Sequence, residues 1–274
     1  MDLLEFLQRF SVIYSILTVR YVLIAGLAFL LIWKLLGSRL AHKYIQPERR
    51  PNKDNILHEI KYSLMTFFIF GLVGIFMYEA NRNGWTRIYR EVDDFGWPYF
   101  VFSVILTIII HDTYFYWTHR WMHWKRIFKY VHLVHHRSTN PTPWAAFSFH
   151  PLEAMVEAGI VPLVAFTMPI HPGALFLFLL YMTFLNVLGH LGYELFPAGF
   201  TRSPWTFWHN TSTHHNMHHR YFNCNYGLYF NLWDRWMKTN HTNYHEAFEK
   251  LATARPSEPS FETLGQPARL RKLS

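Results

Sequence analysis

Long stretches without a charged side chain limit the fold of this sequence more than any other feature. Four stretches share this property: 62–78, 95–110, 158–193 and, apart from Arg20 and Lys34, 12–36. A membrane-spanning helix needs about 20 predominantly apolar residues. The stretch 158–193 is about twice that length and has Pro169, Pro172 and Gly173 near its middle, which favours a hairpin of two helices. The sequence therefore predicts an all-α bundle with four to five transmembrane helices.

The composition agrees with a membrane protein. Only 16% of the residues are charged, against about 25% in a typical soluble domain. The single cysteine, Cys224, excludes a disulfide framework and a metal site built from thiolates. We find no glycine-rich nucleotide-binding loop and no nucleic-acid module, so we expect no nucleic-acid partner.

The distribution of basic residues predicts the orientation of these helices. Segment 34–53 has six basic residues and one acidic residue, and segment 119–137 has five basic residues and no acidic one. Segment 79–94 has three basic and four acidic residues. The positive-inside rule then places 34–53 and 119–137 in the cytoplasm and 79–94 on the other side. The part that follows Tyr193 also becomes cytoplasmic, as a histidine-rich helical cap.

Histidines are the second prominent feature, because 14 of the 18 lie between His111 and His219. Most belong to clusters whose spacings of three and four residues place side chains on one side of a helix. The clusters are His119-x-x-x-His123, His132-x-x-His135-His136 and His214-His215-x-x-His218-His219, with His190 between the last two. Imidazole is a good ligand for zinc, iron and copper, so the clusters predict metal binding at the cytoplasmic boundary of the membrane.

The number of candidate ligands predicts two ions. Nine histidines are available: His119, His123, His132, His135, His136, His190, His215, His218 and His219. A closed structural zinc site takes four ligands, so nine nitrogens suit two ions with four or five nitrogens each. Coordination positions that remain open on the ions would be available for catalysis. Within the third histidine cluster, His214 is an alternative to His215.

An all-imidazole shell is neutral, so nearby carboxylates are needed to compensate the charge of the ions and to orient the rings. The candidates are Asp112, Glu153, Glu157, Glu194 and Asp234. Of these we expect Asp112, Glu157 and Glu194 to take part in catalysis.

The spacing of the ligands leaves the metal open. Two irons suit dioxygen activation, whereas zinc suits a membrane lipid hydrolase that uses a metal-activated water. A metal transporter is a third alternative, but transporters place ligands near the middle of the bilayer. A site at the membrane boundary favours a lipid substrate whose C–H bond is oxidised.

These motifs resemble the fatty acid hydroxylase/sterol desaturase superfamily over about residues 100–240. The resemblance is carried by the histidine boxes, by His190-Leu-Gly-Tyr-Glu194, by Asn225-Tyr-Gly and by Trp233-Asp234-Arg235. It differs at Asn186, where some members have a second histidine, and at Lys238, where a glycine is usual.

The resemblance implies an integral-membrane, di-iron, dioxygen-dependent oxidoreductase that hydroxylates or desaturates a lipid. Zinc is a possible substitute for iron. The electron donor would be a cytochrome b5 or a ferredoxin with its reductase, and the membrane would be a bacterial inner membrane or the endoplasmic reticulum. We expect membrane anchor helices over residues 1–95, a catalytic domain over 96–245 and a disordered tail over 246–274, which is rich in proline, serine and charge.

Overall fold

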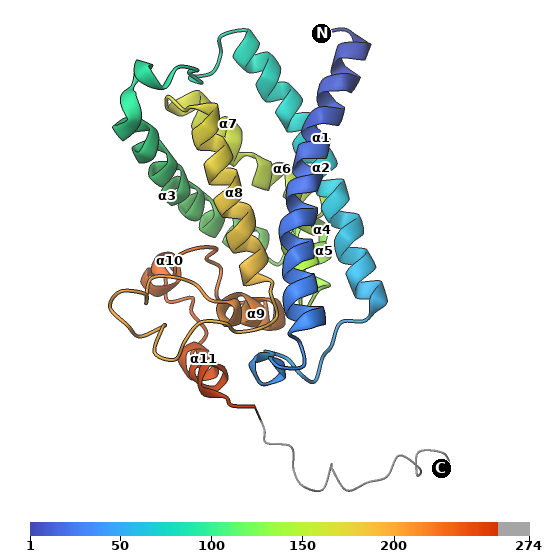
Figure 1. Cartoon of the computed structure of the whole chain (residues 1–274), viewed down its shortest axis with the longest axis vertical. Helices are drawn as coiled ribbons and strands as arrows, with labels where there is room; N and C mark the ends of the chain where they lie inside the picture. Colours follow the sequence, from blue (N-terminus) through green and yellow to red (C-terminus); the bar gives the residue numbers. More distant parts are fainter. Residues whose placement is uncertain (257–274) are drawn as a thin grey trace, which may run out of the picture.

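The computed structural model describes residues 1–256, and all extended regular elements within them are helices (Figure 1). Four are long and apolar enough to cross a membrane. They are α1 (Leu3–Ala28) with its π-helical continuation η1 (Phe29–Leu35), α2 (Lys53–Arg82), α3 (Gly96–Met122) and α8 (Pro172–Gly189). The prediction of an all-α membrane bundle is therefore confirmed.

The outer surface of α1 shows why a membrane is needed. Large apolar side chains such as Val12, Ile16 and Leu23 are each more than half exposed. Of the most apolar 18-residue stretch in the span Leu3–Leu35, only 11% is buried inside the protein. A continuous exposed apolar surface of this kind is stable against lipid rather than against water.

A fifth spanning helix is absent from residues 1–256, because the segment before α8 forms two short helices, α6 (Pro151–Ala158) and α7 (Ile160–Thr167). Each has eight residues, or about 12 Å, against a hydrocarbon core of about 30 Å. The break falls at Gly159, where an added Cβ would lie 2.5 Å from the hydroxyl of Tyr114. That hydroxyl donates a hydrogen bond to the carbonyl of Val156, so α3 holds the break in place.

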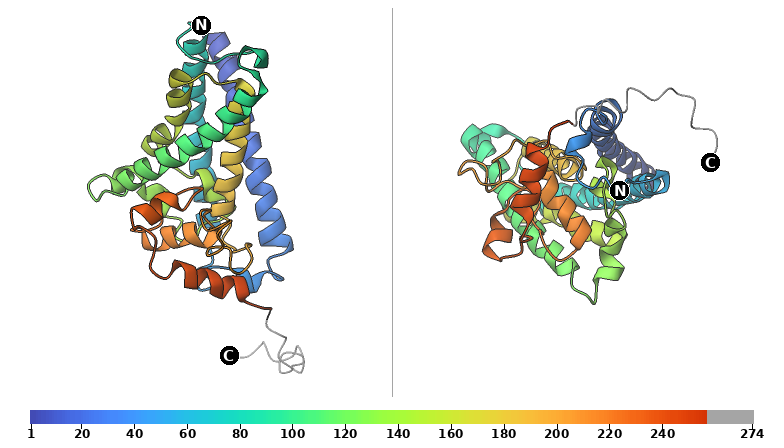
Figure 2. Two further views of the ribbon diagram at one scale, coloured as in Figure 1. Left: turned by 90° about the vertical axis from the view of Figure 1, so that its left-hand side faces the viewer. Right: turned by 90° about the horizontal axis from the view of Figure 1, so that it is seen from below.

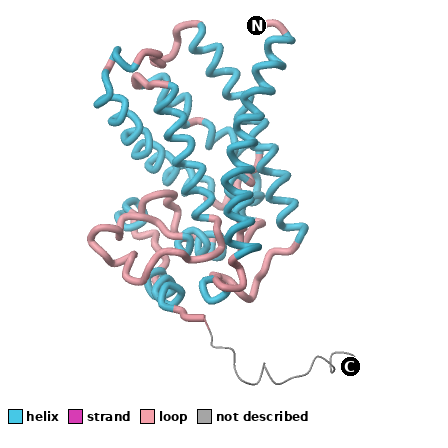
Figure 3. The backbone as a smooth tube through the Cα atoms, in the orientation of Figure 1, coloured by secondary structure: helices cyan, strands magenta, loops and turns pink. Residues whose placement is uncertain are grey.

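The connections gather at two ends of the bundle. The N-terminus, residues 83–95 and residues 168–171 lie at the upper end in Figure 1, and the 3₁₀ helix η3 (Val92–Asp94) belongs to them. Most of the shorter helices lie in the lower half, which is richer in loops (Figures 1 and 3). They are η2 (Ala41–Lys43), α4 (Phe128–Val131), α5 (Leu133–His136), α9 (Ser212–Tyr221), α10 (Leu232–Trp236) and α11 (Tyr244–Thr253).

One hydrophobic core joins the N-terminal helices to the rest of the bundle. Tyr21 of α1 and Phe67 of α2 are buried in the same cluster as Phe147 of the 3₁₀ helix η4 (Pro143–Phe147) and Phe178 of α8. The hydroxyl of Tyr21 donates a hydrogen bond of 2.7 Å to the carbonyl of Trp144. The helices of residues 1–95 therefore pack as part of one bundle with those of the predicted catalytic domain.

The predicted start of a disordered tail at residue 246 is wrong, because residues 246–253 continue α11. Tyr244 and Phe248 of this helix are fully buried beside Met217 of α9. Two aromatic side chains at helical spacing supply an apolar contact that outweighs the polar composition around them. Residues 254–256 follow the helix, and the rest of the predicted tail, 257–274, lies outside the described residues.

Candidate metal centre

The nine predicted ligands come from four places in the chain and meet in the lower half of the bundle. His119 lies in the last turn of α3 and His123 follows that helix; His132 lies between α4 and α5, and His135 and His136 end α5. His190 follows α8, and His215 to His219 lie on α9; Figures 1 and 2 show these helices. Eight of the nine side chains are buried and His123 is half-buried. Polar rings are buried in such number only when they have partners.

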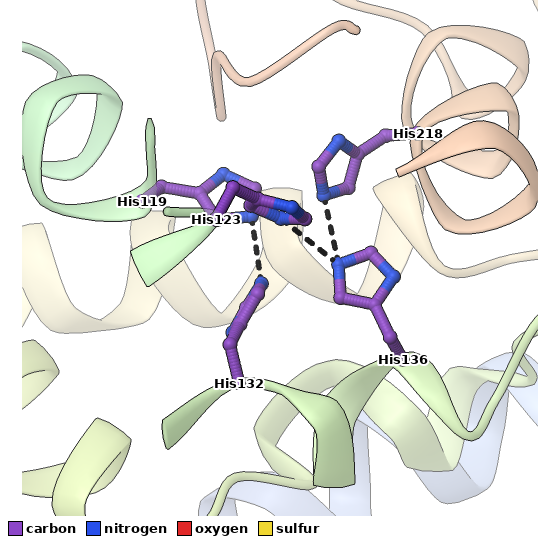
Figure 4. A group of neighbouring side chains, drawn as sticks. All are labelled: His119, His123, His132, His136 and His218. Carbon is purple, nitrogen blue, oxygen red and sulfur yellow. Dashed lines mark hydrogen bonds between the residues drawn. The ribbon is translucent and has the colours of Figure 1, made fainter. Parts of the chain in front are cut away.

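The imidazoles form two groups, and within each group the ligand nitrogens lie within 4.8 Å of one another. The five-histidine group consists of His119, His123, His132, His136 and His218 (Figure 4). The four-histidine group consists of His135, His190, His215 and His219. The groups are neighbours, since the rings of His136 and His219 have centroids 4.8 Å apart.

Each His-x-x-His-His box is divided between the groups. The rings of His132 and His136, four residues apart, enter the five-histidine group, while His135 enters the other. The third box is divided in the opposite sense, because the pair His215 and His219 enters the four-histidine group and His218 the other. Helices α5 and α9 thus each contribute to both groups and fix their spacing.

The separations between nitrogens fit ligands of a common ion. In the five-histidine group, Nε2 of His119 lies 3.0 Å from Nε2 of His132, and Nε2 of His136 lies 3.1 Å from those of His123 and His218. Two nitrogens bound at about 2.1 Å are about 3.0 Å apart for a bond angle of 90° and about 3.4 Å apart for a tetrahedral angle. Three such contacts and five ligands fit a five- or six-coordinate ion better than tetrahedral zinc.

The four-histidine group has a similar geometry. Nε2 of His215 lies 3.0 Å from that of His190 and 3.1 Å from that of His219. Nε2 of His190 and Nε2 of His135 are 3.4 Å apart. With four nitrogens, this group leaves more room on its ion for further ligands.

Hydrogen bonds on the far side of the rings fix the tautomers. The Nδ1–H of His119 donates to the carbonyl of Tyr226, and that of His132 donates to Oε1 of Glu153. Each of these rings then has its proton on Nδ1, so its Nε2 is unprotonated and carries a lone pair. The two facing lone pairs repel each other unless a cation lies between them. The rings of His190, His218 and His219 are held in the same way by carbonyls of Asn186, Cys224 and Ser138.

Burial keeps the rings in the neutral form that binds metal. It lowers the pKa of His190 to about 4, and it lowers the pKa values of His135, His136 and His215 well below the usual range, with a smaller contribution from neighbouring imidazoles. Cations near one another would repel, so protonation is doubly unfavourable here.

These pKa shifts predict how the stability of the metal-free protein depends on pH. Histidines of the unfolded chain take up protons near pH 6.5, about where free imidazole titrates, whereas the buried rings do not. The contribution of these histidines to stability is therefore unaffected above about pH 7 and falls as the pH drops below about 6.5, because the unfolded chain binds more protons at these positions. Thermal unfolding in detergent with a chelator, from pH 8 to pH 5, measures this. An unchanged melting temperature over that range would contradict it.

Among the acidic candidates, Glu153 is the one that contacts a predicted ligand. Its Oε1 lies 2.7 Å from Nδ1 of His132, and both side chains are almost fully buried. Glu157, one turn later on α6, forms no hydrogen bond with any described residue and lines a cavity beside the histidines. Its predicted catalytic role stays a prediction.

Asp112 and Glu194 hold backbone segments in place rather than imidazoles. Oδ1 of Asp112 accepts hydrogen bonds from the amides of Tyr229 and Phe230. Oε2 of Glu194 accepts from the amide and hydroxyl of Thr213 at the start of α9. Neither carboxylate has a hydrogen bond to any of the nine rings within residues 1–256, so catalytic roles for them also stay predictions.

Two open questions about ligands receive geometric answers. Nε2 of His214 lies 3.4 Å from Oδ2 of Asp234 and outside both groups, so His215 rather than His214 is the candidate ligand of the third box. Asn186 uses its side-chain amide to donate to the carbonyl of Ala146, while its own carbonyl orients His190. It orients a candidate ligand, and its side-chain amide is occupied by the hydrogen bond to Ala146.

Sequence reasoning missed the backbone carbonyls of Ser138, Cys224 and Tyr226, which orient three of the rings. The side chains at these positions give no indication of this role, because the contact is made by an atom that every residue has.

The bundle and its two buried imidazole groups define a class, helical membrane proteins with a two-centre histidine site. Within that class, the chain belongs to the fatty acid hydroxylase/sterol desaturase superfamily. Residues 104–239, which hold all nine histidines of the two groups, match the family model described as fatty acid hydroxylase.

Curated relatives agree with this assignment. The chain is 33% identical over 199 residues to Delta(7)-sterol 5(6)-desaturase erg3C of Aspergillus fumigatus, covering 67% of this chain and 62% of that protein. It is 30% identical over 187 residues to lathosterol oxidase of Rattus norvegicus, covering 67% of this chain and 60% of the relative. The match thus spans about three fifths of the length of these relatives. No solved structure matches the chain.

Proposed function

We propose that this protein is a membrane-bound oxidoreductase that hydroxylates or desaturates a C–H bond of a lipid, with two irons held by the two histidine groups. The observation that carries the proposal is one apolar cavity whose wall includes an aromatic neighbour of each group. The ring of Phe115 packs 4.9 Å from that of His119, and the ring of Phe149 packs 5.2 Å from that of His135. Both phenylalanines line the cavity.

The cavity suits an apolar substrate. It has a volume of about 170 Å³ and lies between α1, α2, α3, α6 and α8, with walls formed mainly by aliphatic and aromatic side chains. Such walls exclude water and orient a hydrocarbon by shape rather than by hydrogen bonds. A lipid carbon placed at the floor, beside Phe115 and Phe149, would lie next to the metal ligands.

The remaining residues of the centre position these ligands. Glu153 and the carbonyls behind the rings keep the Nε2 atoms unprotonated and directed toward the ions. Bound irons would supply a dioxygen-derived oxidant strong enough for an unactivated C–H bond. Electrons would come from an external donor such as cytochrome b5 or a ferredoxin with its reductase.

The donor set favours iron over zinc. A zinc-dependent lipid hydrolase would be expected to use about four ligands and a carboxylate close to the ion. Among residues 1–256, both groups contain imidazoles alone, and one contains five. The names of the relatives, sterol desaturases and a lathosterol oxidase, favour a sterol-like substrate.

The side of the membrane follows from charge. Segment 34–53, which is rich in basic residues, lies at the lower end of the bundle (Figure 1), and the basic segment 119–137 carries five of the nine histidines, so we propose that the centre faces the cytoplasm. The host membrane would be a bacterial inner membrane or the endoplasmic reticulum.

Metal analysis combined with lipid profiling tests this function. We expect about two irons per chain after expression in iron-rich medium, and a cellular lipid that differs by one oxygen or two hydrogens when the protein is present. Zinc retained under iron-rich expression, together with a newly hydrolysed lipid, would instead establish the hydrolase. A double variant, His135→Ala with His136→Ala, is the control for lipid changes caused by expression alone.

A further inference from the structure

Arg20 is an unusual residue within the first spanning helix. It is the 18th residue of the 33-residue span Leu3–Leu35 and one of only a few charged side chains there. It lies about 22 Å along the helix from Leu35, by the rise of an α-helix. A cation this deep in the bilayer is costly unless it faces the interior of the bundle and meets a polar partner.

Arg20 does face the interior, because it lines the same apolar cavity as Phe115 and Phe149, whose rings pack against His119 and His135. Its Nε is buried. The next residue, Tyr21, is fixed by its hydrogen bond to Trp144 and by ring contacts with Phe67 and Phe147. The register of α1 is thereby set, and Arg20 cannot turn away from the cavity by rotation of the helix.

No described residue satisfies this guanidinium. Within residues 1–256 Arg20 has no hydrogen bond and no ion pair, and its buried Nε has no acceptor. By contrast, Arg9 on the same helix pairs with Glu5 at 2.9 Å. Arginine stays protonated in proteins, so the cation at residue 20 cannot be removed by losing a proton.

Glu157 is the one carboxylate on the cavity wall, and it does not compensate Arg20. The two side chains form no ion pair at 4.0 Å or less, since the described salt bridges do not include them. The wall of the cavity therefore includes an unpaired donor on α1 and, at other positions, Phe115 and Phe149 beside the histidine groups.

We propose that Arg20 binds the polar head group of the lipid substrate through an acceptor oxygen, either a hydroxyl or a carboxylate. This inference rests on the proposed function. A guanidinium presents several N–H donors in a fixed plane and binds such oxygens strongly in a dry site. The lipid then enters with its head at α1 and its apolar body along the cavity toward Phe115 and Phe149. Arg20 lies outside the matched family segment 104–239, so it would select the substrate of this chain without belonging to the shared metal centre.

The test measures the lipids that copurify with the protein, together with its metal content. Wild type, Arg20→Leu and Arg20→Gln are purified in mild detergent, and bound lipids are quantified by mass spectrometry. Arg9→Leu is the matched control, with the same substitution on the same helix but outside the cavity. We expect wild type and Arg9→Leu to retain a lipid with a free hydroxyl or carboxylate, and both Arg20 variants to retain about 10- to 100-fold less.

The mass of the retained lipid distinguishes a hydroxyl from a carboxylate head group, and either result supports the proposal. It is overturned if the Arg20 variants retain the same lipids in the same amounts as wild type, including the case in which none retains any. Metal content separates this outcome from failure of the proposed function, because Arg20 belongs to neither histidine group and its variants should keep the metal of wild type. A melting temperature for lipid-free Arg20→Leu at or above that of wild type would show that Arg20 does not serve folding.

Discussion

Replacing His135 with alanine is expected to abolish turnover and to remove the ion of the four-histidine group while leaving that of the five-histidine group. His135 is the candidate ligand that α5 contributes to the four-histidine group. Substitution of a residue that only orients a ligand lowers metal affinity or activity about 10- to 100-fold. Loss of a ligand itself should therefore lower them by more than that. Metal analysis should find about one ion per chain instead of two.

His42→Ala is the matched control for this variant. His42 lies in η2, outside both histidine groups, so its removal should change neither metal content nor turnover. His135→Ala with full metal and full turnover would show that the nitrogen of His135 is not a ligand. Loss of both ions would indicate instead that the groups bind cooperatively through α5 and α9, which each contribute to both.

The histidine site could be predicted to this extent because its information is local. Spacings of three and four residues bring rings to one side of a helix, and the eight rings predicted from such spacings lie in the two groups together with the isolated His190. The division of each box between the groups was not predictable. It depends on where the fold places α5 and α9 relative to the ends of α3 and α8, and the spacing within a single helix does not contain that information.

The roles of the acidic residues show where sequence reasoning ends. Asp112, Glu153 and Glu194 are all buried carboxylates near a histidine box. Only Glu153 contacts a ring, while the other two accept hydrogen bonds from backbone amides. The partner of a buried carboxylate is whichever unsatisfied hydrogen-bond donor the fold brings close to it. That donor is often a backbone amide, which cannot be recognised from the sequence.

The membrane helices were predictable where apolar length alone decides, as for α2 and α3. The segment before α8 was harder, because Gly159 and the hydroxyl of Tyr114 interrupt a run that is uniformly apolar. The opposite error occurs at 246–253, where a polar composition predicts disorder but the structure has a helix. Phe248 of this segment packs with Tyr244 against α9.

Glu153 is the site of the second large expected effect. Glu153→Ala removes the carboxylate that accepts from Nδ1 of His132 at 2.7 Å. His132 then loses both its fixed tautomer and part of its basicity. By analogy with other carboxylates behind metal-bound histidines, we expect turnover or metal affinity to fall about 10- to 100-fold. The five-histidine group should show the loss, whereas the four-histidine group should keep its ion.

Glu153→Gln separates charge from geometry at this position. An amide oxygen can still accept from His132, so the tautomer is kept while the negative charge is lost. If orientation is the main contribution, Glu153→Gln should retain most of the metal affinity that Glu153→Ala loses. If the charge also matters, Gln should fall between Ala and wild type, because the buried carboxylate compensates the positive ion. Titration with Fe²⁺ under anaerobic conditions measures the affinity of each variant. Equal affinities for Ala, Gln and wild type would show that the carbonyl-held rings alone position the ion, and that His132 needs no partner.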